Sequence, residues 1–102
     1  MNGSIIIPEK FKLAGKTITI IVDDDYCTDN GFVGEADFTE KVITVCGRFK
    51  GKVVSKAERE QTYYHELGHM ILDSMGKHKL KYDEGFVEDF AQRLYEYEKT
   101  KQ

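Results

Sequence analysis

Residues 55–76 read SKAEREQTYYHELGHMILDSMG and carry both signals of a helix with defined ends. Ser55 followed three residues later by Glu58 is the capping-box pattern, in which each side chain can bond the backbone N–H of the other. Gly76 supplies the stop, because glycine readily adopts the left-handed conformation that ends helices. The pattern therefore predicts a helix that begins at residue 56 and ends at residue 74 or 75.

An H-E-x-x-H pattern lies inside this helix as His65-Glu66-Leu67-Gly68-His69. Residues four apart lie one turn above each other on one helix face, so His65 and His69 can share a metal ion while Glu66 projects beside it. Two imidazoles and a third protein ligand leave an open position for water, which is the arrangement of a hydrolytic zinc site. Glu66 would take the proton of that water and deliver it to the leaving amine.

The phase of the helix separates the two histidines from its apolar side. At about 100° per residue, the large apolar side chains gather on one side and His65 and His69 point nearly opposite. We therefore do not expect the histidines on the core face. Gly68 costs about 1 kcal/mol relative to alanine in a helix interior, which is tolerated where a ligand or a neighbouring backbone comes close. The apolar side comprises Tyr63, Tyr64, Leu67, Met70, Ile71 and Met75.

A third metal ligand is expected from the next helix, for which Asp83 is the N-cap and which reaches about Lys99. The short connection makes this helix return antiparallel across the first. Counting helix levels from His69 favours Glu88 as the ligand, with Glu84 as the alternative. Whichever carboxylate does not bind metal can hydrogen-bond a ligand histidine. The apolar stripe of this helix comprises Phe86, Val87, Phe90, Ala91, Leu94 and Tyr97.

Three other polar features carry weaker signals. Asp73, four residues after His69, either orients an imidazole through its second nitrogen or is a surface charge near the helix end. His78 is expected to be exposed to solvent and not to bind metal. Asp23–Asp25 lacks the following glycine and distal glutamate of a calcium loop, so it predicts a polar turn.

The first half of the chain predicts strands. Thr17–Val22 is β-branched and apolar without polar alternation, which indicates a strand covered on both faces. Gly31–Phe38 and Lys41–Cys46 predict a hairpin, and Gly47–Val54 predicts a loop or a frayed strand. The proline after Ile5–Ile7 limits that segment to an edge strand or an entry arm. The expected fold class is α+β, with a small N-terminal β-sheet packed on two C-terminal helices.

Composition restricts the functions that the chain can have. Its 102 residues suit a single domain, residues 1–102, that needs neither a disulfide nor a metal merely to fold. Fifteen basic and 18 acidic residues give a net charge of −3, which argues against a nucleic-acid partner. No apolar run is long enough for a bilayer and no targeting segment is evident, so a cytoplasmic protein is expected. Cys27 and Cys46 lack a C-x-x-C pattern and are expected to be buried or half-buried free thiols.

Three phrases, GEADF at residues 34–38, HELGHMILD at 65–73 and EGFVEDFA at 84–91, occur in this order. Together they resemble the small zinc metallopeptidases related to the ImmA/IrrE family, which are often carried by phages and mobile elements. The resemblance covers roughly residues 31–97. It implies a minimal zincin fold, in which a small sheet backs the zinc-bearing helix and a second helix contributes an acidic ligand.

By this resemblance His65 and His69 would bind zinc, Glu66 would be the general acid/base and Glu88 would be the third ligand. The longer Glu-x-x-Ala-Asn-x-Phe-Ala phrase of larger relatives is present only as Phe90-Ala91, so the choice between Glu88 and Glu84 stays open. The chain also lacks the helix-turn-helix module of some larger members, and repressor cleavage is therefore not implied.

The expected function is that of a zinc-dependent metallopeptidase acting on a peptide or protein substrate. The substrate would lie extended along an edge strand, either Lys41–Cys46 or Gly31–Phe38, because an exposed edge supplies main-chain hydrogen bonds. Zn²⁺ is favoured over manganese, cobalt or iron by the ligand set and its availability. Two alternatives are a non-catalytic zinc-binding accessory or interaction module and a zinc hydrolase of non-peptide amides.

Overall fold

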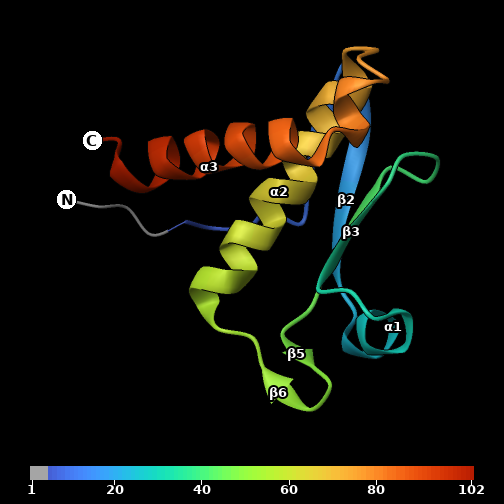
Figure 1. Cartoon of the computed structure of the whole chain (residues 1–102), viewed down its shortest axis with the longest axis vertical. Coiled ribbons are helices and arrows are strands. Elements are labelled where there is room, and N and C mark those ends of the chain that lie inside the picture. The colour runs from blue at the N-terminus through green and yellow to red at the C-terminus, as the bar shows by residue number, and fades with distance from the viewer. Residues whose placement is uncertain (1–4) are drawn as a thin grey trace.

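A computed structural model describes residues 5–102, which form a small mixed sheet and three α-helices (Figure 1). The α+β class is therefore confirmed. In chain order the elements are β1 (Lys10–Leu13), β2 (Lys16–Val22), α1 (Asp24–Asn30), β3 (Gly34–Asp37), β4 (Val42–Val45), β5 (Arg48–Phe49), β6 (Lys52–Val53), α2 (Lys56–Ser74), the 3₁₀ helix η1 (Leu80–Tyr82) and α3 (Glu84–Thr100).

The main sheet has the strand order β1-β2-β4-β3. β2 and β4 pair in parallel, whereas β1–β2 and β3–β4 are antiparallel. The predicted hairpin is confirmed as β3 and β4, with Gly34 opposite Val45 and Asp37 opposite Val42. β3 is thus an edge strand of the described sheet, and β4 lies between two partners. The expectation that the segment of β4 could bind substrate at a sheet edge is wrong for this reason.

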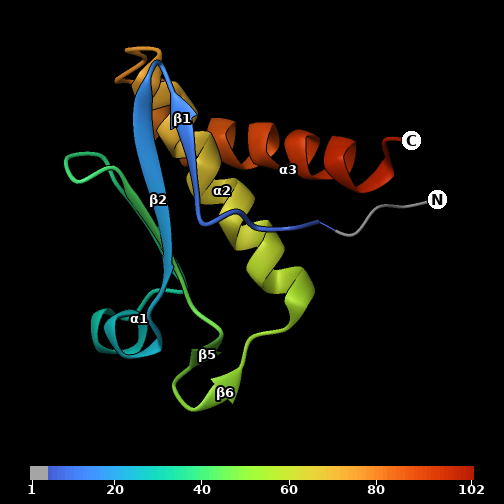
Figure 2. The ribbon, with the colours of Figure 1, turned by 180° about the vertical axis from the view of Figure 1, so that it is seen from behind.

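β2 is covered on one face only, contrary to the prediction from its apolar sequence. Ile18 is buried, whereas Ile21, which points to the opposite face, is 41% exposed. Figures 1 and 2 show the cause, since α2 and α3 both lie on the same side of the sheet. A run of apolar residues does not by itself distinguish a strand covered on both faces from one covered on a single face.

One segment of the first half differs from its prediction, one is more ordered than predicted, and one agrees with the prediction of an entry arm. Asp23 accepts a hydrogen bond from the backbone N–H of Tyr26 at 3.0 Å and so begins helix α1, where a polar turn was expected. The segment expected to be a loop or a frayed strand contains the short β5–β6 hairpin. Ile5–Ile7 is an arm without strand pairing, and Ile5 is buried against the core.

Both ends of α2 agree with the capping signals. The Ser55 hydroxyl accepts a hydrogen bond from the backbone N–H of Glu58 at 3.1 Å and donates one to its carboxylate at 2.9 Å. The helix ends at Ser74, and Gly76 follows with φ of 71°. α3 packs closely at Gly68, where a Cβ atom would lie 3.4 Å from Val87 Cγ1. The glycine within the motif therefore accommodates a neighbouring helix.

The two cysteines are free and buried, as predicted. Burial raises the pKa of Cys27 to about 12 and also raises that of Cys46, so neither is a thiolate at neutral pH. Within residues 5–102 no helix combines the length and the apolar character that crossing a membrane requires.

Gly34 allows β3 to approach α2, and its replacement is a test of this packing. A Cβ atom at Gly34 would overlap Thr62 Cγ2 and lie 3.4 Å from Glu66 Cγ. We expect Gly34→Ala to lower the free energy of unfolding by about 1–3 kcal/mol, as overpacking usually does. Urea denaturation of the variant and the wild type measures this change.

The matched control removes the atom with which the new methyl group collides. Thr62→Ser lacks Cγ2, so Gly34→Ala combined with Thr62→Ser should recover most of the stability that Gly34→Ala loses. A Gly34→Ala variant as stable as the wild type would contradict the close approach of β3 and α2.

Candidate metal centre

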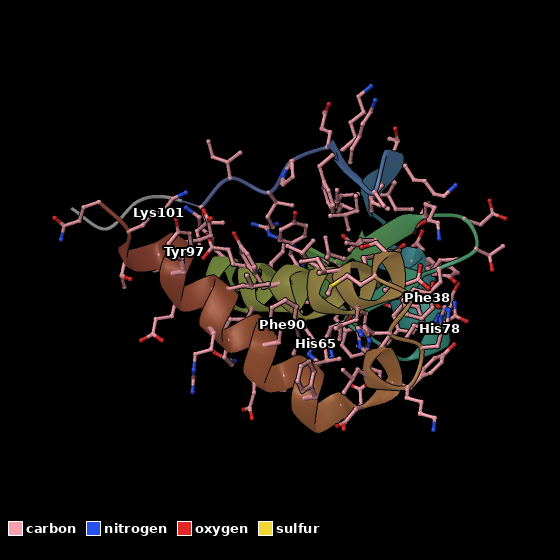
Figure 3. All side chains as sticks on the ribbon, turned by 90° about the horizontal axis from the view of Figure 1, so that it is seen from above. Phe38, His65, His78, Phe90, Tyr97 and Lys101 are labelled. Carbon is pink, nitrogen blue, oxygen red and sulfur yellow. The ribbon has the colours of Figure 1, made fainter. Side chains whose placement is uncertain are left out.

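His65, His69 and Glu84 each offer a ligand atom, and these atoms lie within 4.8 Å of one another. The two histidines occupy successive turns of α2, with ring centroids 4.9 Å apart. Glu84 is the first residue of α3; its Oε2 lies 3.0 Å from His65 Nε2 and its Oε1 lies 3.3 Å from His69 Nε2. Figure 3 shows His65 directed from α2 toward the beginning of α3. Two imidazoles and one carboxylate therefore converge from two helices.

The carboxylate beside both histidines is that of Glu84, the alternative, and not that of the favoured Glu88. Glu88 Oε1 lies 3.6 Å from the other ring nitrogen of His65, Nδ1, which makes it a neighbour of a potential ligand. Counting helix levels from His69 placed the third ligand one turn too far along α3, because η1 runs back beside α2. The backbone carbonyl of Lys81 already reaches His69, so α3 begins at the level of the histidines.

His69 is buried, with 8% of its surface exposed, although the helix phase placed both histidines away from the core. His69 is not part of the hydrophobic core cluster, and its burial comes from Phe38, which precedes α2, and from Lys81, which follows it. The ring of Phe38 packs edge-on against His69 with centroids 6.3 Å apart, and Tyr82 packs in turn on Phe38. His65 keeps 22% of its side chain exposed, so the two rings form a site that is closed at one end and open at the other.

A backbone contact determines the tautomer of the neutral His69 ring. Its Nδ1 donates a hydrogen bond to the carbonyl oxygen of Lys81, which can only accept. Nε2 of the neutral ring therefore carries a lone pair, and this lone pair faces the carboxylate of Glu84. Two electron-rich atoms at 3.3 Å repel unless a positive charge, either a proton or a metal ion, lies between them. The arrangement is thus suited to a cation.

Asp73 organises the segment that supplies this carbonyl. Its two carboxylate oxygens accept hydrogen bonds from Lys81 Nζ at 2.7 Å and from Lys41 Nζ at 3.1 Å. Burial alone would raise the pKa of Asp73, but the bonds from Lys81 and Lys41 outweigh it and hold the pKa below its usual range. Asp73 therefore does not bond an imidazole directly; it anchors Lys81, whose carbonyl orients His69.

Glu66 lies beside the histidines and outside the group of three ligands. Burial raises its pKa to about 7; the carboxylates of Glu84 and Glu35 add to this shift, and His65 opposes it. A carboxyl group with a pKa near neutrality can both accept and release a proton at physiological pH.

Two cavities meet at Gly34, His65 and Glu66. The larger has a volume of about 560 Å³ and extends toward β5 and the start of α2. The smaller, of about 340 Å³, extends along β3 toward Tyr82. Together they form a cleft that passes over Glu66 and is bordered by the edge strand β3, one of the two segments that the sequence proposed for substrate.

The structure also shows where three tyrosines, His78 and Lys81 lie relative to the candidate metal centre. Tyr63 and Tyr64 are buried in the core, as predicted, whereas Tyr82 lines the smaller cavity and is 67% exposed. His78 is exposed, as predicted, and does not belong to the ligand group. The role of Lys81 was missed, because it acts on His69 through its backbone and side-chain patterns carry no signal for such a contact.

Comparison of the chain with models of known protein families, with curated proteins and with solved structures gave no match. The likeness to the ImmA/IrrE family thus remains an expectation from three short phrases.

Proposed function

We propose that this chain is a zinc-dependent metallopeptidase with a minimal zincin-like fold, as its resemblance to the ImmA/IrrE family implies. His65, His69 and Glu84 would hold the metal, and Glu66 would act as the general base. The observation that carries the proposal is the convergence of the three ligand atoms within 4.8 Å, next to a carboxyl group whose pKa is near 7.

The residues present fit a catalytic zinc ion. Two imidazole nitrogens and one carboxylate oxygen are a ligand set of hydrolytic zinc sites, which keep a further position open. His69 presents a lone pair on Nε2 because Nδ1 donates to Lys81. A bound Zn²⁺ supplies Lewis acidity, which polarises a carbonyl group and lowers the pKa of water. Glu88 Oε1, which lies 3.6 Å from His65 Nδ1, would then accept a hydrogen bond from that nitrogen and orient the ring.

Glu66 would perform the proton transfers of peptide hydrolysis. Its carboxylate takes one proton from the attacking water as the oxygen bonds to the scissile carbonyl carbon. The same proton then passes to the amide nitrogen as the C–N bond breaks, which leaves a carboxylic acid and an amine. The raised pKa of Glu66 favours both directions of transfer near neutral pH.

The edge strand β3 favours a peptide over a small amide as the substrate. Its outer main-chain groups border the smaller cavity, where an extended peptide could add as a further strand. Tyr82 lines the same cavity and is a candidate hydrogen-bond donor to the developing oxyanion. A purely structural zinc site would have no use for Glu66, which disfavours the alternative of a non-catalytic zinc module.

Zinc content of purified variants tests the site. We expect one zinc ion per wild-type chain and loss of that zinc in His69→Ala, measured by elemental analysis, with His78→Ala as the matched control that retains it. In competition titrations Glu88→Gln should weaken zinc binding by about 10–100-fold, as loss of an outer hydrogen bond does. Glu84→Gln should weaken it more, because a ligand is lost.

Which of the two glutamine variants loses more zinc affinity decides which glutamate is the third ligand. A larger loss of affinity in Glu88→Gln than in Glu84→Gln would assign that role to Glu88. A wild-type chain that binds no zinc under saturating conditions would overturn the proposed function itself.

A further inference from the structure

The larger cavity beside the candidate metal centre combines apolar and acidic lining. Phe32 and Val33, which precede β3, and Phe49 of β5 contribute apolar surface, while Glu58 of α2 and Glu88 of α3 contribute carboxylates. Among the described residues that line this cavity, none is a lysine or an arginine. Because it shares Gly34, His65 and Glu66 with the smaller cavity, it lies next to the position of the scissile bond.

Of the three carboxylates that line this cavity, Glu58 and Glu88 have no lysine or arginine partner within the described chain. Glu58 Oε1 accepts a hydrogen bond from the Ser55 hydroxyl at 2.9 Å, a neutral partner that belongs to the helix cap. Glu88 lies 3.6 Å from His65 Nδ1, and 56% of its side chain is exposed. In the part of the chain that the structure describes, neither carboxylate forms an ion pair with lysine or arginine. Neither negative charge is therefore neutralised by a lysine or an arginine, and Glu88 also faces His65.

We infer that this cavity is the subsite for a long cationic side chain, arginine or lysine, next to the scissile bond of the peptide substrate. The methylene stem packs along the surface of Phe32, Val33 and Phe49, as such stems do on apolar surfaces. The charged head meets Glu58 and Glu88, and an aromatic face adds a cation–π contribution. That the ligand is a peptide substrate rests on the proposed function. The preference for a cationic side chain rests on the cavity alone.

The smaller cavity is also lined by carboxylates and apolar side chains, but it has less room for a long side chain. Its carboxylates are Glu66, the proposed ligand Glu84, and Glu35, which accepts a hydrogen bond from the Tyr26 hydroxyl at 2.9 Å. Glu66 lines both cavities and each cavity has one further carboxylate beside the metal centre, so the cavities differ chiefly in size, about 560 Å³ against about 340 Å³. The selectivity for a cationic side chain is therefore assigned to the larger cavity.

The test compares arginine with citrulline, which has nearly the same shape and no charge. N-acetyl-arginine methylamide and N-acetyl-citrulline methylamide are titrated into the zinc-loaded, isotope-labelled protein, and amide shifts are followed by NMR. We expect the arginine probe to bind about 10-fold more tightly and to shift the amides of Val33 and Phe49. Equal binding of the two probes, or shifts confined to other surfaces, would overturn the inference.

Glu58→Gln assigns the preference to this cavity. Glutamine preserves the capping box with Ser55, so the helix should keep its start while the charge is removed. The preference for arginine over citrulline should fall about 3–5-fold in this variant and stay unchanged in Glu40→Gln, an exposed control on the turn after β3. An unchanged preference in Glu58→Gln contradicts the assignment.

A second measurement separates this inference from the proposed function. Two peptides that differ only by arginine or citrulline beside the cleavage site are compared by their kcat/KM values. Cleavage of both peptides at equal rates would overturn the subsite and leave the peptidase standing. Preferential binding of arginine without cleavage of either peptide would support the cation site and count against the peptidase.

Discussion

Glu66→Gln is expected to lower the turnover of a cleavable peptide by about 10²–10⁴-fold while leaving stoichiometric zinc in place. Glutamine has nearly the shape of glutamate but cannot accept the proton of the attacking water. Glu66 lies outside the group formed by His65, His69 and Glu84, so the metal ligands are untouched. Turnover and zinc content are measured on the same protein samples.

The stability of this variant provides an independent check. Burial raises the pKa of Glu66, which means that its charged form is disfavoured in the folded protein. In the zinc-free protein, Glu66→Gln should therefore unfold at the same or a higher temperature than the wild type. His69→Ala is the contrasting variant, because it should lose zinc and turnover together. Wild-type turnover in Glu66→Gln would exclude the general-base role, and loss of zinc would make Glu66 a ligand.

Asp73→Ala is expected to lower the free energy of unfolding by about 3–5 kcal/mol, the usual effect of removing one partner of a buried ion pair. Asp73 and Lys81 keep only 12% and 9% of their side chains exposed. Without Asp73 the ammonium of Lys81 would be left between the rings of Phe38 and Tyr82 without a carboxylate. Urea denaturation measures the loss.

Two companion variants separate the effect of the buried Asp73–Lys81 pair from that of the more exposed Asp73–Lys41 pair. Lys41→Ala should cost no more than about 1 kcal/mol, because Lys41 is 31% exposed and its pairing is partly solvated. Asp73→Ala combined with Lys81→Met removes both charges and should recover much of the stability. A double variant as unstable as Asp73→Ala alone would show that the ion pair is not the cause.

The loss of stability caused by Asp73→Ala should depend on pH in a direction that the pKa of Asp73 defines. The folded protein holds the pKa of Asp73 below its usual range. The stability that Asp73 contributes is therefore complete above about pH 4, the unfolded value, and is lost as the pH falls through the lower folded pKa. The gap in stability between the wild type and Asp73→Ala should shrink below about pH 4 and stay constant from there to neutrality.

The helix that carries the candidate ligands was predictable because its signals are local. Ser55, Glu58 and Gly76 mark its ends through bonds and backbone conformations within one turn. The spacing of His65 and His69 places their rings together once the helix forms. The β3–β4 hairpin was predictable for a similar reason, since its two strands are close neighbours in sequence.

Predictions that depended on distant partners were less successful. The apolar run of β2 did not reveal that both long helices lie on one face of the sheet, which leaves Ile21 exposed. Helix α1 was missed because its cap, Asp23, was interpreted as part of a turn. The burial of His69 was missed because Phe38 and η1, which cover it, come from two distant parts of the chain.

The amino-acid pattern alone was enough to specify α2, its ends, and the pair His65 and His69 with Glu66 between them, because helix geometry follows from neighbours in the chain. The docking of η1 and α3 on α2 settled which carboxylate faces the two rings and which nitrogen of His69 carries a proton. These features depend on packing and hydrogen bonds between segments far apart in sequence, and no local spacing encodes the level at which one helix meets another.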